Sequence, residues 1–131
     1  MIDIAVQAPP ELADRLAGAV RFACSELGIT RASVGLMVVD PDRMAEINAE
    51  HRGTPTPTDV LSFPVDGPDI FDGWPENGPE PELGDIVICP PEAEESLETL
   101  AVHGLLHLVG YDHETDSGEM LTLQDLSLVH I

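Results

Sequence analysis

The apolar positions at the start of the chain follow the two periods that distinguish strands from helices. Ile2, Ile4 and Val6 alternate with Asp3 and Ala5, which predicts a short strand with one buried face. Apolar residues then recur at helical spacing over 12–27, before Gly28, a residue typical of a helix end. The chain is therefore expected to open with a strand followed by a helix.

The middle of the chain repeats this order. Residues 33–39 form an apolar run that is long enough only for a buried strand. Asp40 and Pro41 suit an N-cap followed by a proline in the first turn, so we expect a helix that fades near Gly53. A proline-rich loop then leads into a further strand over 60–65.

The second half is expected to begin with a loop and to end in helices. Residues 66–82 are rich in glycine, proline and acidic residues, which favours a loop without fixed secondary structure. Residues 83–89 read as another buried strand. The helix expected over 92–109 is apolar nearly all round, as buried helices are, and Thr115 or Asp116 can cap a last helix.

This order of elements predicts an α/β fold. We expect a mixed sheet of about four strands packed with about four helices. The first three strands along the chain should be parallel, because right-handed crossovers can join them, and the fourth can run antiparallel after the acidic loop. At 131 residues the chain can bury one core, so we expect a single domain over 1–131.

The charge balance changes this picture in one respect. The chain contains 25 acidic residues against five basic ones, all arginine, and its formal net charge is −20. Proteins that bind nucleic acid usually carry a basic patch, because neutralised phosphates supply much of their affinity. Composition alone therefore does not suggest RNA, which would have to be held by a metal and a few arginines or delivered by a partner. Solubility in a salty interior would also explain the acidity.

Other features of the composition bear on the compartment. The chain shows no signal peptide and no apolar run near the length of a membrane span, so we expect a cytoplasmic protein with no membrane partner. Cys24 and Cys89 lie in apolar stretches without C-x-x-C spacing. Buried free thiols are therefore favoured over a disulfide or metal ligands.

The stretch 103–113, HGLLHLVGYDH, carries the candidate chemistry. His103 and His107 are four residues apart, so on a helix both imidazoles face one ion. Gly110 can end the helix with a left-handed backbone and bring up His113 as a third ligand. Three imidazole nitrogens and an open fourth position describe a catalytic site for one zinc ion better than a structural site. The alternative is three unconnected histidines on the surface or in the core.

The same spacing occurs in the metzincin proteases, H-E-x-x-H-x-x-G-x-x-H. Those enzymes need a glutamate directly after the first histidine as the general base. Gly104 occupies that position here and can neither accept nor donate a proton. A metzincin-like peptidase is therefore disfavoured.

Several stretches resemble the YbeY family, which comprises metal-dependent endoribonucleases of bacterial ribosomal RNA maturation. The resemblance covers most of 44–63 and 83–120, although the family usually has a longer segment between Cys89 and the metal helix. It rests on four motifs. The histidine motif lies at 103–113, and an N-x-x-[aromatic or His]-R segment runs from Asn48 to Arg52. A TDVLSFP strand lies at 58–64, and the sequence LGDIVIC lies at 83–89.

This resemblance implies a function and a set of site residues. The family's fold is a mixed four-stranded sheet, and its members cut single-stranded RNA in maturation and quality control of small-subunit ribosomal RNA. We accordingly expect ribosomal RNA and the small ribosomal subunit with its proteins as partners, and no DNA. Arg52 and His103 are the expected catalytic residues, and zinc would bind to His103, His107 and His113.

Arg52 also suits this role chemically. Its guanidinium is planar, permanently charged and able to bind phosphate through two hydrogen bonds, although a surface salt bridge is the alternative in so acidic a chain. His51 is expected to pack rather than to react. Asp59 and Ser62 match the family's TDVLSFP strand, and the role of these two residues can be catalytic or structural. Asp112 can orient a ligand imidazole or cap the turn.

A second class of function stays open. A ribosome-assembly module without catalysis, built around a structural metal, would fit the net charge and the short segment after Cys89. It predicts a closed fourth ligand and no turnover of RNA.

Overall fold

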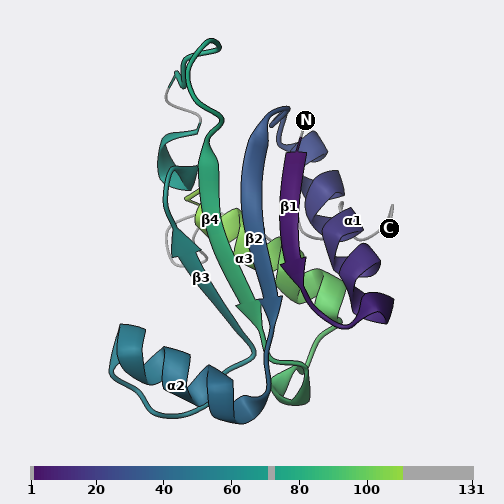
Figure 1. The fold of residues 1–131 in the computed structure, drawn as a ribbon, viewed down its shortest axis with the longest axis vertical. Coiled ribbons are helices and arrows are strands. Elements are labelled where there is room, and N and C mark those ends of the chain that lie inside the picture. Colours follow the sequence, from purple (N-terminus) through teal and green to yellow (C-terminus); the bar gives the residue numbers. More distant parts are fainter. Residues whose placement is uncertain (1, 71–72, 111–131) are drawn as a thin grey trace.

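The structure is a computed structural model that describes residues 2–70 and 73–110 (Figure 1). Its order of elements along the chain is β1 (Ile2–Gln7), α1 (Pro10–Glu26), β2 (Ala32–Val38), α2 (Pro41–Arg52), β3 (Val60–Pro64), the 3-10 helix η1 (Gly67–Asp69), β4 (Glu82–Ile88), the 3-10 helix η2 (Pro90–Glu92) and α3 (Leu97–Leu108).

The four strands form one mixed sheet in the order β1-β2-β4-β3. Strands β1, β2 and β4 are mutually parallel, and β3 pairs antiparallel with β4, with Val60 opposite Ile88 and Pro64 opposite Gly84. The predicted α/β class and the mixed four-stranded sheet are therefore correct.

The antiparallel strand is not the one that we predicted. It is β3, the third along the chain, rather than the fourth. The reason lies in α2, which sits beyond the end of the strands instead of crossing a face of the sheet (Figure 1). The chain therefore re-enters the sheet at the end where β2 left it, and β3 must run in the opposite direction.

The helix content also differs from the prediction of about four helices. The described residues contain three α-helices, and the last predicted helix, from Thr115 or Asp116, lies outside them. Helix α3 begins at Leu97 and not near residue 92, because η2 occupies 90–92 and Ser96 supplies the N-cap. The Ser96 hydroxyl accepts a hydrogen bond from the Thr99 amide at 3.1 Å.

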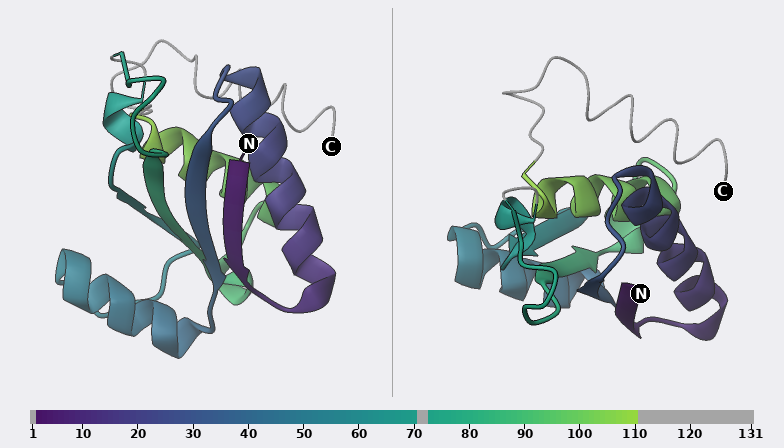
Figure 2. Two further views of the ribbon diagram at one scale, coloured as in Figure 1. Left: turned by 45° about the horizontal axis from the view of Figure 1, so that its top comes forward. Right: turned by 90° about the horizontal axis from the view of Figure 1, so that it is seen from above.

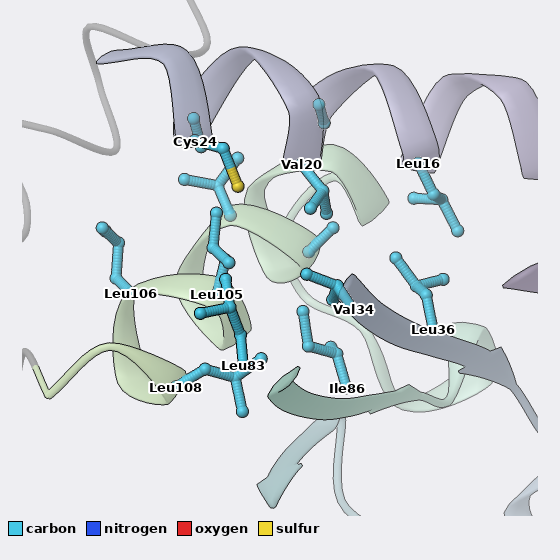
Figure 3. Packing of buried hydrophobic residues seen from close by; sticks show 14 of the residues in the cluster. Leu16, Val20, Cys24, Val34, Leu36, Leu83, Ile86, Leu105, Leu106 and Leu108 are labelled. Atoms are coloured by element: carbon cyan, nitrogen blue, oxygen red, sulfur yellow. The ribbon is translucent and has the colours of Figure 1, made fainter. Parts of the chain in front are cut away.

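Helices α1 and α3 cover one face of the sheet, and α2 lies toward the other (Figure 2). The main core fills the space between α1, α3 and the inward faces of β2 and β4 (Figure 3). Its largest buried side chains include Leu16, Val20, Val34, Leu83, Ile86, Leu105, Leu106 and Leu108. A smaller cluster joins α2 to β3 and β4 through Met44, Ile47, Leu61, Val87 and Cys89.

Both cysteines are buried free thiols, as predicted. Cys24 belongs to the main core and Cys89 to the smaller cluster. None of the helices in the described ranges is long and apolar enough to cross a membrane.

Candidate metal and RNA site

Helix α3 places two of the predicted metal ligands side by side. His103 and His107 are half-buried on one face of the helix, and their Nε2 atoms lie 2.9 Å apart. The two rings meet edge to face with centroids 4.5 Å apart. Two imidazole nitrogens at this separation point at the same small volume.

This arrangement fits a zinc ion. Zinc–nitrogen bonds are about 2.0–2.1 Å long, so one ion can reach two nitrogens that lie 2.9 Å apart. Gly110 follows the helix with a φ of 99°, which confirms the predicted left-handed turn. His113 and Asp112 lie outside the described residues, and within those residues no group of three or more potential ligands is assembled.

Gly104 allows α3 to pack closely against the sheet. A Cβ atom at this position would lie 2.7 Å from Ile86 Cγ2 and 3.3 Å from Ser62 Oγ. The Ser62 hydroxyl donates a hydrogen bond to the Gly104 carbonyl at 3.1 Å and so ties β3 to the helix. The residue that replaces the glutamate of the proteases is therefore required by packing. The sequence signal for this contact is a glycine within an otherwise apolar, helix-forming segment.

Arg52 reaches the same region from the end of α2. The helix begins as predicted, with Asp40 accepting a hydrogen bond from the Arg43 amide at 2.8 Å and with Pro41 in the first turn. It ends at Arg52 because Gly53 adopts a left-handed φ of 72°. A basic residue in the last turn also interacts favourably with the helix dipole.

A cavity of about 350 Å³ brings these elements together. Arg52 from α2 and the two histidines from α3 line it, although they are about fifty positions apart in the sequence. Strand β3 forms the wall between them. The complete lining is Arg52, Asp59, Val60, Ser62, Pro64, His103 and His107.

The residues of β3 in this cavity have defined local partners. The Asp59 carboxylate accepts a hydrogen bond from the Val60 amide at 2.8 Å and fixes the start of the strand. Ser62 holds α3 as described above. Both side chains thus have a structural role in a wall of the cavity, and sequence reasoning did not anticipate that Val60 and Pro64 line it as well.

Two residues of α2 that precede Arg52, Asn48 and His51, have defined contacts. Asn48 is 6% exposed, and its Nδ2 donates to the Thr56 carbonyl at 2.9 Å across the loop that follows the helix. Its Oδ1 is buried and has no hydrogen-bond partner within the described part of the chain. The His51 ring packs against Phe63 with centroids 4.6 Å apart, so the packing role predicted for His51 is confirmed.

Other arginines are committed elsewhere in the fold. Arg15 forms an ion pair with Glu98, and Arg43 pairs with Glu46 at 3.0 Å. Arg31 donates to the carbonyls of loop residues at 3.1 and 3.2 Å. Over 2–70 and 73–110 Arg52 forms no salt bridge, so the alternative of a surface ion pair is not observed there.

Comparison with known proteins relates the whole chain to one family. Residues 4–131 match the family model described as endoribonuclease YbeY. Proteins with that name from Salinispora tropica and Thermobifida fusca are 40% and 37% identical to the chain. The matches cover 85% and 95% of this chain, and 82% and 89% of those proteins.

One solved structure is similar to this chain over nearly its whole length. The solution structure of a Thermotoga maritima protein superposes with a TM-score of 0.58 at 28% sequence identity. The match covers 98% of this chain and 87% of that one. The chain therefore shares its fold with an experimentally determined structure.

Proposed function

Because the chain belongs to the YbeY family of endoribonucleases, we propose that it is a zinc-dependent enzyme that cuts single-stranded RNA in maturation and quality control of small-subunit ribosomal RNA. Family membership makes it an endoribonuclease, a hydrolase of RNA phosphodiester bonds. The metal, the RNA substrate and the cellular process are the parts that we propose.

One observation carries this proposal. The cavity joins a permanently charged guanidinium to two converging imidazoles along the wall formed by β3. A phosphodiester needs a cation for its negative oxygens and a means of activating the attacking oxygen. Arg52 provides the first, and the histidine pair is a donor set for an ion that provides the second.

His103, His107 and His113 would hold the zinc ion. When bound, zinc would polarise a phosphoryl oxygen and lower the pKa of water from 15.7 to about 7. His103 thereby contributes to catalysis as a ligand. The imidazoles of His103 and His107 are half-buried, which limits their exposure to solvent, and α3 fixes their spacing at one helical turn.

Arg52 would bind the scissile phosphate and stabilise the charge that develops on it. Its guanidinium carries five N–H donors in a planar fork, which matches two phosphate oxygens at once. It lies at the rim of the cavity on an exposed helix end, where an incoming strand can reach it. Arg52 forms no salt bridge with any carboxylate that the structure describes, so it can bind a phosphate without first breaking one.

The packing of Gly104 opposes a peptidase. A glutamate at this position would have to displace Ile86 and Ser62 from the helix surface. The general base of the metzincin mechanism therefore has no room, and the histidine spacing alone does not provide it.

We further propose that the enzyme acts in the cytoplasm, in association with the small ribosomal subunit. The acidity of the chain supports a delivered substrate, because a net charge of −20 repels free RNA over most of the surface. Proteins of the subunit would hold the RNA near the cavity, and Arg52 would make the local contact.

Cleavage of a labelled precursor that contains the 3′ end of small-subunit ribosomal RNA tests the proposal. We expect the wild-type protein with zinc to cut it, and His107→Ala or dialysis against a chelator to abolish cutting. His51→Ala is the matched control, since it removes a neighbouring histidine that packs on Phe63 outside the cavity lining. Cutting that survives His107→Ala would contradict the proposal, as would a wild-type protein that binds zinc and cuts no RNA.

A further inference from the structure

Strand β3 is an edge strand that faces the candidate site. Among the described residues it pairs on one side only, with β4, and it lies at the outer edge of the sheet (Figure 1). An edge strand leaves alternate backbone N–H and C=O groups without a partner in the sheet. The cavity lined by Arg52 and the two histidines lies along this edge.

The pairing pattern identifies which residues of β3 face outward. The Cys89 amide donates to the Asp59 carbonyl at 2.9 Å, and the Val65 amide donates to the Leu83 carbonyl at 3.0 Å. In an antiparallel pair, residues that bond to the partner alternate with residues that do not. The backbone groups of Val60, Ser62 and Pro64 therefore point away from β4, and these residues line the cavity.

These three residues leave one hydrogen-bond donor on the edge. The Val60 amide is already bonded to the Asp59 carboxylate at 2.8 Å, and Pro64 has no N–H group. Within the ranges that the structure describes, the Ser62 N–H has no partner, and the outward carbonyls of Val60 and Ser62 lie on either side of it. The edge thus presents a donor between acceptors, and the hydroxyl of the same Ser62 bonds to the Gly104 carbonyl of α3.

We propose that this edge, centred on the Ser62 main chain, binds an unpaired nucleobase of the RNA substrate. The inference rests on the function proposed above. A phosphate only accepts hydrogen bonds, so the flanking carbonyls would repel it. A nucleobase presents donors and acceptors side by side on its Watson–Crick edge, and this edge is accessible only in single-stranded RNA.

Base recognition also explains how a chain with a net charge of −20 can bind RNA. Neutral backbone groups bind a base without the lysines and arginines that a phosphate contact requires, and this chain has five basic residues against 25 acidic ones. Ser62 lies across from Gly104, which follows His103 and precedes His107 by three residues. The bound base would therefore belong to a nucleotide next to the phosphate that Arg52 contacts.

A pair of substitutions separates the Ser62 backbone from its side chain. Ser62→Pro removes the N–H and the hydroxyl, whereas Ser62→Ala removes the hydroxyl alone; proline is tolerated on the outward side of an edge strand. Binding of a fluorescent, unstructured 2′-O-methyl oligoribonucleotide to the zinc-loaded proteins is the readout. We expect Ser62→Pro to weaken binding roughly five- to tenfold relative to Ser62→Ala, as loss of one hydrogen bond should. Equal affinities of the two variants would overturn the proposal.

A second measurement uses the wild-type protein and does not depend on the folding of Ser62→Pro. Bases are removed from the oligonucleotide one at a time, leaving abasic sugars. We expect one position at which base removal weakens binding several-fold; uniform affinities across all positions would overturn the proposal. Both measurements report binding, so an absence of cleavage would count against the proposed function alone and leave this inference to be decided by the binding data.

Discussion

The two helices that supply the site are held very differently. Seven of the twelve residues of α3 are buried, and six of these seven belong to the main core with α1 and the sheet. Only three of the twelve residues of α2 are buried, and its cluster with β3 and β4 is small. The histidines therefore lie on a wall fixed by the core, and Arg52 lies at the end of a lightly anchored helix.

This difference separates two tasks within one cavity. Metal ligands need a rigid spacing, since an ion tolerates little change in bond length, and α3 provides it. An arginine that meets an incoming strand benefits from a helix that can adjust at lower free-energy cost. Changes to the α3 wall should therefore alter stability and zinc binding together, and changes to the α2 wall should alter RNA cleavage with little effect on stability.

The largest predicted effect on stability follows from crowding the α3 wall. Gly104→Ala would place a methyl group 2.7 Å from Ile86 Cγ2, so the helix must move or the core must repack. We expect a loss of about 1–3 kcal/mol in the free energy of unfolding and weaker zinc binding. Urea denaturation and zinc titration measure both quantities.

Gly18→Ala is the matched control for this change. Gly18 lies in α1, and a Cβ atom there would meet nothing within 4 Å. Replacing an unhindered helical glycine should stabilise the protein by roughly 0.5–1 kcal/mol. If both alanine variants gain stability, close packing at Gly104 does not position the metal helix.

A second prediction uses the buried thiols as reporters of the two clusters. Burial raises the pKa of Cys24 to about 12, and burial is also the main cause of the raised pKa of Cys89. Each thiol should therefore react with an alkylating reagent only after its surroundings open. Because the α2 cluster is smaller, we expect Cys89 to react at least about tenfold faster than Cys24.

Single-cysteine proteins, made by Cys24→Ala and Cys89→Ala, allow the two rates to be measured by mass spectrometry. Equal rates, both matching global unfolding, would show that the two walls open as one unit.

The Cys24 thiol also has a pH consequence: its raised pKa adds stability below its ordinary pKa of 9.0, and this contribution is lost as the pH rises from there toward 12. Alkaline denaturation measured with Cys24→Ala as reference checks the direction.

Only a small change in stability is expected from replacing Asn48. Its buried Oδ1 lacks a described partner, so Asn48→Leu exchanges an unsatisfied oxygen for apolar contact with the α2 cluster. We expect the free energy of unfolding to stay within about 1 kcal/mol of wild type. Cleavage should slow several-fold, because the bond to Thr56 that steadies the loop after Arg52 is lost.

Thermal melts and single-turnover cleavage measured on the same Asn48→Leu preparation decide this point. A variant that is both less stable and less active would give Asn48 a purely structural role. Unchanged cleavage would show that the loop does not govern the position of Arg52.

Much of this fold could be predicted because local signals agree with the final structure. Asp40 and Pro41 start α2 and Gly53 ends it, as capping chemistry requires. The alternation of Ile2 to Val6 matches the half-buried pattern of β1. The strand directions could not be read in the same way, because they depend on where α2 sits relative to the sheet, and no local pattern records that.

The candidate site shows a similar division. Helical spacing was sufficient to bring His103 and His107 together, since four residues make about one turn. The presence of Arg52 in the same cavity depends on the pairing of β3 with β4 and came from family resemblance rather than from spacing. Long-range packing such as the Gly104–Ile86 contact lay beyond the reach of sequence patterns.

In the proposed mechanism Arg52 acts on the substrate from a wall of the cavity that does not hold the metal. Single-turnover cleavage by Arg52→Ala, with zinc content measured in the same sample, tests it most directly. Arg21→Ala, which removes an exposed arginine from α1, is the matched control for the lost charge.

We predict that Arg52→Ala retains zinc and wild-type stability, while its cleavage rate falls about 10²–10³-fold, equivalent to about 2.7–4 kcal/mol of barrier. Arg21→Ala should cut at close to the wild-type rate. A wild-type rate for Arg52→Ala, or a loss of zinc together with activity, would contradict the account.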